Sequence, residues 1–222
     1  MLLTMQPITE FLATLTERTS TKYYKHKSYV DLGGEQSKQR IRELEAENIE
    51  LRKQLASHRL QAYRDPLTGI ANRRAYDEKL SEEISRCMRN QKVFSLVIWD
   101  IDLFKQINDD FGHQTGDQVL RAVAKKLNSR MRKSDFTARI GGEEFISLFI
   151  DCDQQQAFAR ADSLREEIAQ QPIQTNAGDK LITISCGVSQ FSPNINAETL
   201  FSQADRALYQ AKHNGRNRVC RA

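Results

Sequence analysis

The chain has 222 residues, of which 39% are hydrophobic and 28% charged, with a formal net charge of +4. This length suits one full domain with an extension, or two small domains. No apolar run approaches the roughly 18 residues that cross a bilayer, and Met1 to Glu10 lacks a signal-peptide pattern, so we expect a cytoplasmic protein without a membrane span. The absence of a basic tail or patch argues against nucleic acid as a partner.

The cysteines are too far apart to form a C-x-x-C pair. Two disulfides are arithmetically possible, but buried thiols in a reducing compartment are the favoured interpretation. The four residues are Cys87, Cys152, Cys186 and Cys220.

Residues 1–36 form a first segment, with helical spacing of apolar residues from Ile8 to Leu15 and an aromatic cluster from Tyr23 to Val30. Gly33-Gly34 marks a break. Two interpretations stay open: the segment packs against a dimer mate or a frayed helix, or it docks a regulatory protein. It is too short to be a sensor domain with its own core.

The pattern of residues 37–63 predicts a dimerising stalk. Mostly apolar residues recur at alternating intervals of three and four positions, as at the a and d positions of a coiled coil. Asn48 at an a position favours two parallel strands, and the charges at g and e could pair Arg40 with Glu45 of the partner. The alternative is a single solvated amphipathic helix. The seam comprises Ile41, Leu44, Asn48, Leu51, Leu55, His58 and Ala62.

Residues 64–222 alternate between helical and strand patterns, which predicts one α/β (α+β) domain built around a sheet. Val93 to Ile101 is a nearly unbroken apolar run and predicts a buried central strand. Asn72 is the expected N-cap of the first helix. Helices are predicted over 72–90, 117–131, 157–169 and 200–212, and strands over 93–101, 136–140, 145–150, 180–188 and 218–220.

Two carboxylates end the central strand. Asp100 and Asp102 are two residues apart, which places both on one face of a strand. Such carboxylates can hold Mg²⁺ against nucleotide phosphates. An Asp-x-Asp at a strand end is also common as a cap or turn, so this pair needs further support.

A glycine-rich hairpin and two cations supply that support. Gly141-Gly142 permits a tight turn and close approach of a ligand, and the adjacent Glu143 and Glu144 repel each other unless a cation or solvent intervenes. Lys212 and Arg216 could reach phosphates from the end of the last helix. Together these features indicate metal-assisted phosphoryl transfer without a P-loop.

Residues 65–222, about 70% of the chain, resemble the GGDEF family of diguanylate cyclases, which condense two GTP into cyclic di-GMP. The resemblance rests on five motifs that occur in order. They are Asp65 to Arg74 at the start, Asp100 to Asp109 with its continuation from Gly112 to Asp117, Arg139 to Phe145 in the Glu variant of the hairpin, Ala204 to Lys212, and Gly215 to Arg218. The resemblance implies a palm-like nucleotidyl-cyclase fold, with a central, mostly antiparallel sheet flanked by helices and preceded by the helical stalk.

The resemblance also implies roles for individual residues. Asp100, the backbone carbonyl of Ile101 and Glu143 would bind two Mg²⁺ or Mn²⁺ ions per GTP, while Asp102 would support the site. Glu143 is the favoured general base, with Glu144 as the alternative. The guanine would be read by Asn108 and Asp117, with Phe104, His113, Gly141 and Gly142 also contacting the substrate. Lys105, Lys212 and Arg216 would hold the triphosphate.

Regulation follows from the same resemblance. Arg132, Asp135 and Arg139 would form an inhibitory site for the product, cyclic di-GMP. Each domain would hold one GTP, so catalysis would need a homodimer, joined through the stalk and with higher oligomers open. Two alternatives remain: a non-catalytic receptor for GTP or cyclic di-GMP, and a stalk that mainly serves as a scaffold for a partner protein.

Overall fold

The computed structural model describes the backbone of residues 35–222 and the side chains of residues 37–55 and 61–222. The chain divides into two units between Ala56 and Ser57. The expectations for the first 34 residues lie outside the described part. None of the described helices combines the length and apolarity that a bilayer span requires.

Helix α2 (Glu35–Ala62) is continuous and corresponds to the predicted stalk. Its seam residues Ile41, Leu44, Leu51 and Leu55 are 48–58% exposed in the single chain. The described side-chain contacts of this helix are local: Arg40 pairs with Glu43, and other bonds join residues four apart. An isolated helix with this much exposed apolar surface is marginal in water, so the predicted coiled coil would stabilise it.

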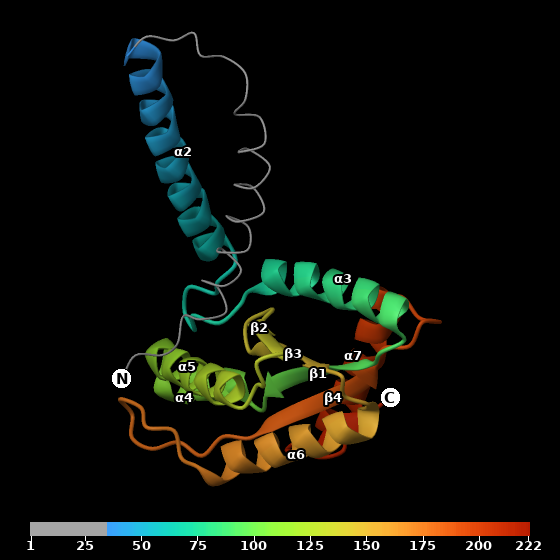
Figure 1. Ribbon diagram of the computed structural model, residues 1–222. Helices are drawn as coiled ribbons and strands as arrows, with labels where there is room; N and C mark the ends of the chain where they lie inside the picture. The colour runs from blue at the N-terminus through green and yellow to red at the C-terminus, as the bar shows by residue number, and fades with distance from the viewer. Residues whose placement is uncertain (1–34) are drawn as a thin grey trace. The chain divides into compact units, whose positions relative to one another are not determined.

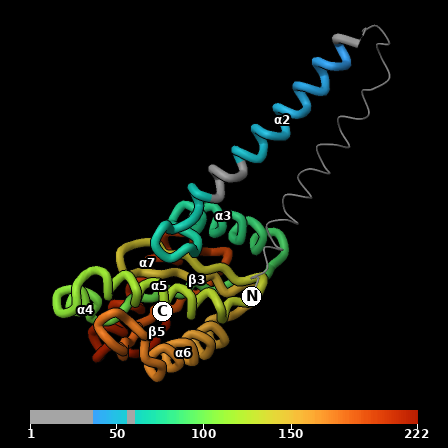
Figure 2. The backbone as a smooth tube through the Cα atoms, turned by 90° about the vertical axis from the view of Figure 1, so that its left-hand side faces the viewer, coloured from blue at the N-terminus to red at the C-terminus, as the bar shows by residue number. Residues whose placement is uncertain are grey.

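The second unit is built on one five-stranded sheet in the order β2-β3-β1-β4-β5 (Figures 1 and 2). All neighbouring strands are antiparallel except β4 and β5. The expectation of a mostly antiparallel sheet is therefore confirmed, as is the buried central strand. The strands are β1 (Phe94–Ile101), β2 (Phe136–Arg139), β3 (Glu144–Ile150), β4 (Ile184–Gln190) and β5 (Val219–Arg221).

Helices cover both faces of the sheet (Figure 1). Alternate residues of β1 point to opposite faces, so Trp99 packs in a core with α5 and α6, and Ile98 packs in a second core with α3 and α7. All eight residues of β1 are buried, which fixes the register of this strand at the sheet centre. The helices are α3 (Arg73–Asn90), α4 (Phe104–Phe111), α5 (His113–Ser129), α6 (Gln154–Gln170) and α7 (Ala197–His213).

Most predicted elements are present, with shifted ends. The Asn72 side chain caps α3 by accepting from the Ala75 N–H, as predicted. Helix α4 was not predicted, because Gly112 at φ +81° ends it after two turns and starts α5 at once. Strand β4 begins four residues later than expected, since Lys180 pairs with Ile173 in a separate bridge.

The cysteines agree with the favoured interpretation. All four are free thiols. Three are buried and Cys220 is partly exposed. Burial raises the pKa of the Cys186 thiol, so it behaves as a small core residue.

Candidate active site

Asp100 is the buried carboxylate at the end of β1. Lys212 from the last turn of α7 lies 2.7 Å from its Oδ2, and the Asp100 side chain is only 6% exposed. Burial raises the pKa of Asp100 to about 6; Lys212 opposes the rise, whereas Glu143 and Glu144 add to it. Such a concentration of negative charge favours a bound cation, and the Lys212 ammonium meets part of that demand.

The hairpin between β2 and β3 brings Glu143 and Glu144 to the same place. The backbone N–H of Ile101 donates to the carbonyl of Glu143 at 3.4 Å, and Glu144 lies opposite Asp100 in the strand register. Gly141 leaves room for this arrangement, because a Cβ there would lie 2.7 Å from the Glu144 Oε2 and would displace that carboxylate. The sheet therefore places the predicted metal-binding residues Asp100, Ile101 and Glu143 beside one another.

These donors suit Mg²⁺. It commonly takes one or two carboxylates from the protein and the remaining oxygens from substrate phosphates and water. The described part of the chain holds no group of three or more acidic, His or Cys side chains positioned for one ion. Two carboxylates and a backbone carbonyl fit a metal that arrives together with a nucleotide better than a closed structural site.

The predicted guanine-reading residues lie on two consecutive helices. Asn108 is on α4, and Asp117 is on the first turns of α5. The two helices approach closely because position 116 is glycine: a Cβ there would lie 1.9 Å from the Asn108 Oδ1. The half-exposed Asp117 carboxylate also lies 3.8 Å from the Arg121 guanidinium. His113 is exposed, whereas Phe104, at the start of α4, is buried.

The predicted triphosphate cations differ in their surroundings. Lys105 is exposed and forms a surface pair with Asp109 at 3.1 Å. Lys212 bonds Asp100, as described above. Arg216 is exposed, and no hydrogen bond or ion pair of its guanidinium is recorded among the described residues, so all its donors are available to an anion.

Asp102 is separate from this metal-facing group. Its carboxylate is buried and accepts from three donors: the hydroxyls of Thr183 and Ser185 and the backbone N–H of Asn217. These bonds use both oxygens, so the side chain holds β4 and the turn after α7 next to β1. That Asp102 supports the site stays a prediction.

The motifs, the fold and the site together identify the family. The model of the diguanylate cyclase GGDEF domain matches residues 62–218. The chain belongs to the GGDEF family.

Among relatives of the GGDEF chain is "Diguanylate cyclase DgcP" of Pseudomonas aeruginosa, which is 40% identical over 181 residues. The match covers 82% of this chain but only 27% of that protein. A solved structure of the coiled coil and GGDEF domain of DgcB from Caulobacter crescentus, in complex with c-di-GMP, has a TM-score of 0.78 at 33% identity, covering 83% of this chain and 98% of that one.

A second solved structure is the diguanylate cyclase SiaD in complex with its activator SiaC, from Pseudomonas aeruginosa. The alignment covers 97% of this chain and 82% of the SiaD chain, with a TM-score of 0.69 and 29% identity. Both neighbours share the fold of this GGDEF domain.

The residues of the predicted product site have internal contacts in this GGDEF domain. The Asp135 side chain is fully buried, pairs with Arg160 at 2.5 Å, and accepts from the backbone N–H of Arg132 and of Ile150. Arg160 also lies over the Phe149 ring. Only Arg132 of the predicted set is exposed.

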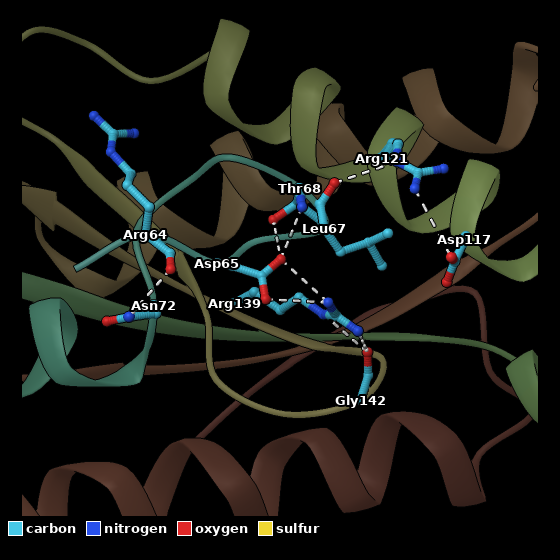
Figure 3. Close-up of polar contacts among 9 residues, drawn as sticks. All are labelled: Arg64, Asp65, Leu67, Thr68, Asn72, Asp117, Arg121, Arg139 and Gly142. Carbon is cyan, nitrogen blue, oxygen red and sulfur yellow. Dashed lines mark hydrogen bonds and ion pairs between the residues drawn. The ribbon is translucent and has the colours of Figure 1, made fainter. Parts of the chain in front are cut away.

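Arg139 connects two motifs that are far apart in the sequence (Figure 3). Its guanidinium bonds both oxygens of Asp65 and donates to the carbonyl of Gly142 in the hairpin. Burial alone would raise the pKa of Asp65, but hydrogen bonds from Thr68 and Arg139 hold it below its usual range. The motif residues gave no signal for this pairing, because complementary charges 74 positions apart cannot be matched from one sequence.

Proposed function

We propose that this GGDEF domain is a diguanylate cyclase that condenses two molecules of GTP into cyclic di-GMP and two pyrophosphates. The observation that carries the proposal is the convergence of buried Asp100 with Glu143 and Glu144 at one end of the sheet. Those carboxylates repel one another unless a divalent cation lies between them. A nucleoside triphosphate can bring that cation, because it binds Mg²⁺ through its phosphate oxygens.

The chemistry requires two identical displacements. In each one the 3′-hydroxyl oxygen of one GTP forms a bond to the α-phosphorus of the other, the bond from that phosphorus to the bridging oxygen breaks, and pyrophosphate leaves with its electron pair. The hydroxyl proton passes to a base, for which Glu143 is the favoured residue and Glu144 the alternative.

Asp100, the carbonyl of Ile101 and Glu143 would hold Mg²⁺ or Mn²⁺, which neutralises charge on the phosphates. Lys212 would leave Asp100 when the ion binds, and its ammonium would then be available to the triphosphate together with Lys105 and Arg216. Asn108 and Asp117 would accept or donate hydrogen bonds at the guanine edge, which disfavours adenine because its donor pattern differs.

The second domain would come from a second copy of this chain. The seam of α2 exposes Leu44 and Leu51 in the single chain, which is the surface that a parallel coiled coil buries. Joining the two domains raises the concentration of each near the other. Residues 37–63 would thus be the dimerising stalk and 64–222 the cyclase domain. Residues 1–36 would dock a regulatory protein, as SiaD has an activator partner.

Feedback inhibition by cyclic di-GMP is part of the proposal. Arg132 is exposed at the start of the R-x-x-D turn, and its guanidinium suits a phosphate or the guanine edge. DgcB is described in complex with c-di-GMP. Asp135 would contribute by holding the turn through the Arg132 N–H, rather than through a free carboxylate.

The test is incubation of the full chain with GTP and Mg²⁺ and chromatographic separation of the products. We expect cyclic di-GMP and pyrophosphate from the parent and a rate at least 1,000-fold lower from Glu143→Ala, because both the base and a metal ligand are lost. Asp179→Ala removes an exposed carboxylate elsewhere and serves as the matched control. A receptor would instead be supported if the parent binds cyclic di-GMP and neither the parent nor the Arg132→Ala variant turns over GTP.

The stalk is tested separately. Replacement of Leu44 and Leu51 by Glu places like charges in the seam, so we expect a monomer by light scattering and loss of cyclase activity at low protein concentration. Deletion of residues 1–36 should change turnover and preserve the dimer. Full activity of a monomer would contradict the requirement for two domains.

A further inference from the structure

Asp102 occupies an unusual position for a carboxylate. It is 6% exposed, and no cation pairs with it among the described residues. Neutral donors satisfy it instead: the Thr183 and Ser185 hydroxyls at 2.6 Å and the Asn217 N–H at 3.0 Å. A buried carboxylate kept in place by this many hydrogen bonds has a positional role.

The bond to Asn217 reaches the turn between α7 and β5, where the backbone is strained. Arg216 has φ +62° and Asn217 has φ +45°, in the left-handed region that residues other than glycine occupy rarely, with asparagine among the more tolerant. Two such residues in succession persist only where surrounding contacts fix them. Asp102 bonds the N–H of the peptide that joins them.

Further bonds anchor the rest of this turn. The Arg216 N–H donates to the carbonyl of Ala211 at 3.0 Å, and Arg165 donates to the Asn217 side chain at 2.9 Å. The backbone on both sides of Arg216 is therefore tied down, whereas its guanidinium is exposed. A cation presented on a fixed backbone loses less conformational entropy when it binds an anion.

We propose that Asp102 is a positioning residue that fixes the Arg216–Asn217 turn so that the Arg216 guanidinium meets the triphosphate of GTP. This inference rests on the proposed function, because it needs GTP as the ligand. It assigns to Asp102 no contact with metal or substrate. Its effect on the nucleotide passes through Arg216.

The experiment is a double-mutant cycle on nucleotide binding, measured by calorimetric titration in the presence of Mg²⁺ with a GTP analogue whose α,β-bridging oxygen is replaced by methylene, so that no turnover occurs. Arg216→Ala should weaken binding by roughly 10- to 100-fold, as expected for lost charge-assisted hydrogen bonds. Asp102→Ala should weaken it about tenfold in the parent and less than twofold in the Arg216→Ala background. Asp179→Ala, which removes an exposed carboxylate, should leave the affinity unchanged.

Asp102→Asn provides a second variant in case the alanine variant does not fold. The amide keeps the shape: its oxygen can accept from Thr183 and from the Asn217 N–H, and its NH2 group can donate to the Ser185 hydroxyl, which rotates to accept. We expect a loss of about threefold in affinity that also disappears in the Arg216→Ala background.

The inference would be overturned if the Asp102 variants changed the affinity equally in both backgrounds, or did not change it at all. The proposed function would survive that outcome as long as the parent binds the nucleotide. A direct metal ligand would give equal effects together with a higher Mg²⁺ requirement. If the parent binds no GTP, the proposed function fails and this inference fails with it.

Discussion

The two sides of the hairpin differ in how their charged residues are used. On the side proposed to bind substrate, Arg216 and Lys105 are exposed, and Lys212 is the one cation paired with the Asp100 carboxylate among the described residues. On the side proposed to bind product, the side chains of Asp135 and Arg139 are largely buried in ion pairs with Arg160 and Asp65. The first arrangement leaves charges available to a ligand, whereas the second uses them to hold the domain together.

This difference separates residues that share one motif. Arg132 and Asp135 both belong to the R-x-x-D pattern, yet the arginine is exposed and the aspartate side chain is fully buried. A motif can therefore combine an exposed residue, here the proposed product contact Arg132, with a buried one that shapes the turn. Variants on the product side should distinguish these roles, because they affect stability, turnover and inhibition to different extents.

The largest effect is expected for Asp135→Ala. The variant leaves Arg160 without its carboxylate partner in a mostly buried setting, so we expect the free energy of unfolding to fall by about 3 kcal/mol. Urea denaturation measures this loss. Asp179→Ala, an exposed carboxylate, should change it by less than about 0.5 kcal/mol. A stable Asp135→Ala protein would mean that the pair is not structural.

Arg139→Ala should mainly reduce turnover. The side chain ties the Gly142 carbonyl, next to Glu143, to Asp65. Loosening the hairpin should lower kcat by about tenfold when no product is present, since a misplaced catalytic group costs rate. Initial rates at saturating GTP measure the change, with Arg89→Ala as the exposed control. An unchanged initial rate combined with weaker product inhibition would make Arg139 a product contact.

Arg132→Ala should act on inhibition alone. We expect the inhibition constant for cyclic di-GMP to rise at least tenfold, because a charge-assisted contact is lost. The uninhibited rate and the free energy of unfolding should stay within the error of the parent, since the side chain is exposed. Rate measurements at increasing cyclic di-GMP test this. Unchanged inhibition would rule out a product site at this turn.

The smallest effect concerns pH. Contacts with Thr68 and Arg139 lower the pKa of Asp65 in the folded state. Its stabilising contribution is therefore present above its ordinary pKa and is lost as the pH falls through the lowered value. Between pH 6 and about pH 3, Asp65→Asn should lose about 1 kcal/mol less stability than the parent. Urea titrations at the two pH values measure it, and parallel curves for both proteins would contradict it.

The sequence was informative wherever a feature depends on neighbouring residues. Val93 to Ile101 predicted the central strand because a strand buried on both faces reads as a continuous apolar run. Asn72 predicted the start of α3 because its side chain bonds within the same turn. Helix α4 was missed, since its eight residues are too few for a periodic pattern.

The chain order of the motifs by itself determined the family, the sheet type and the set of charged residues available for phosphoryl transfer. The tertiary structure decided which of those charges are accessible. It pairs Arg139 with Asp65 and Asp135 with Arg160, and it joins Asp102 to the turn that carries Arg216. These contacts link residues 25 to 115 positions apart. Only the packed sheet and helices bring such groups within hydrogen-bond distance, because no local periodicity relates them.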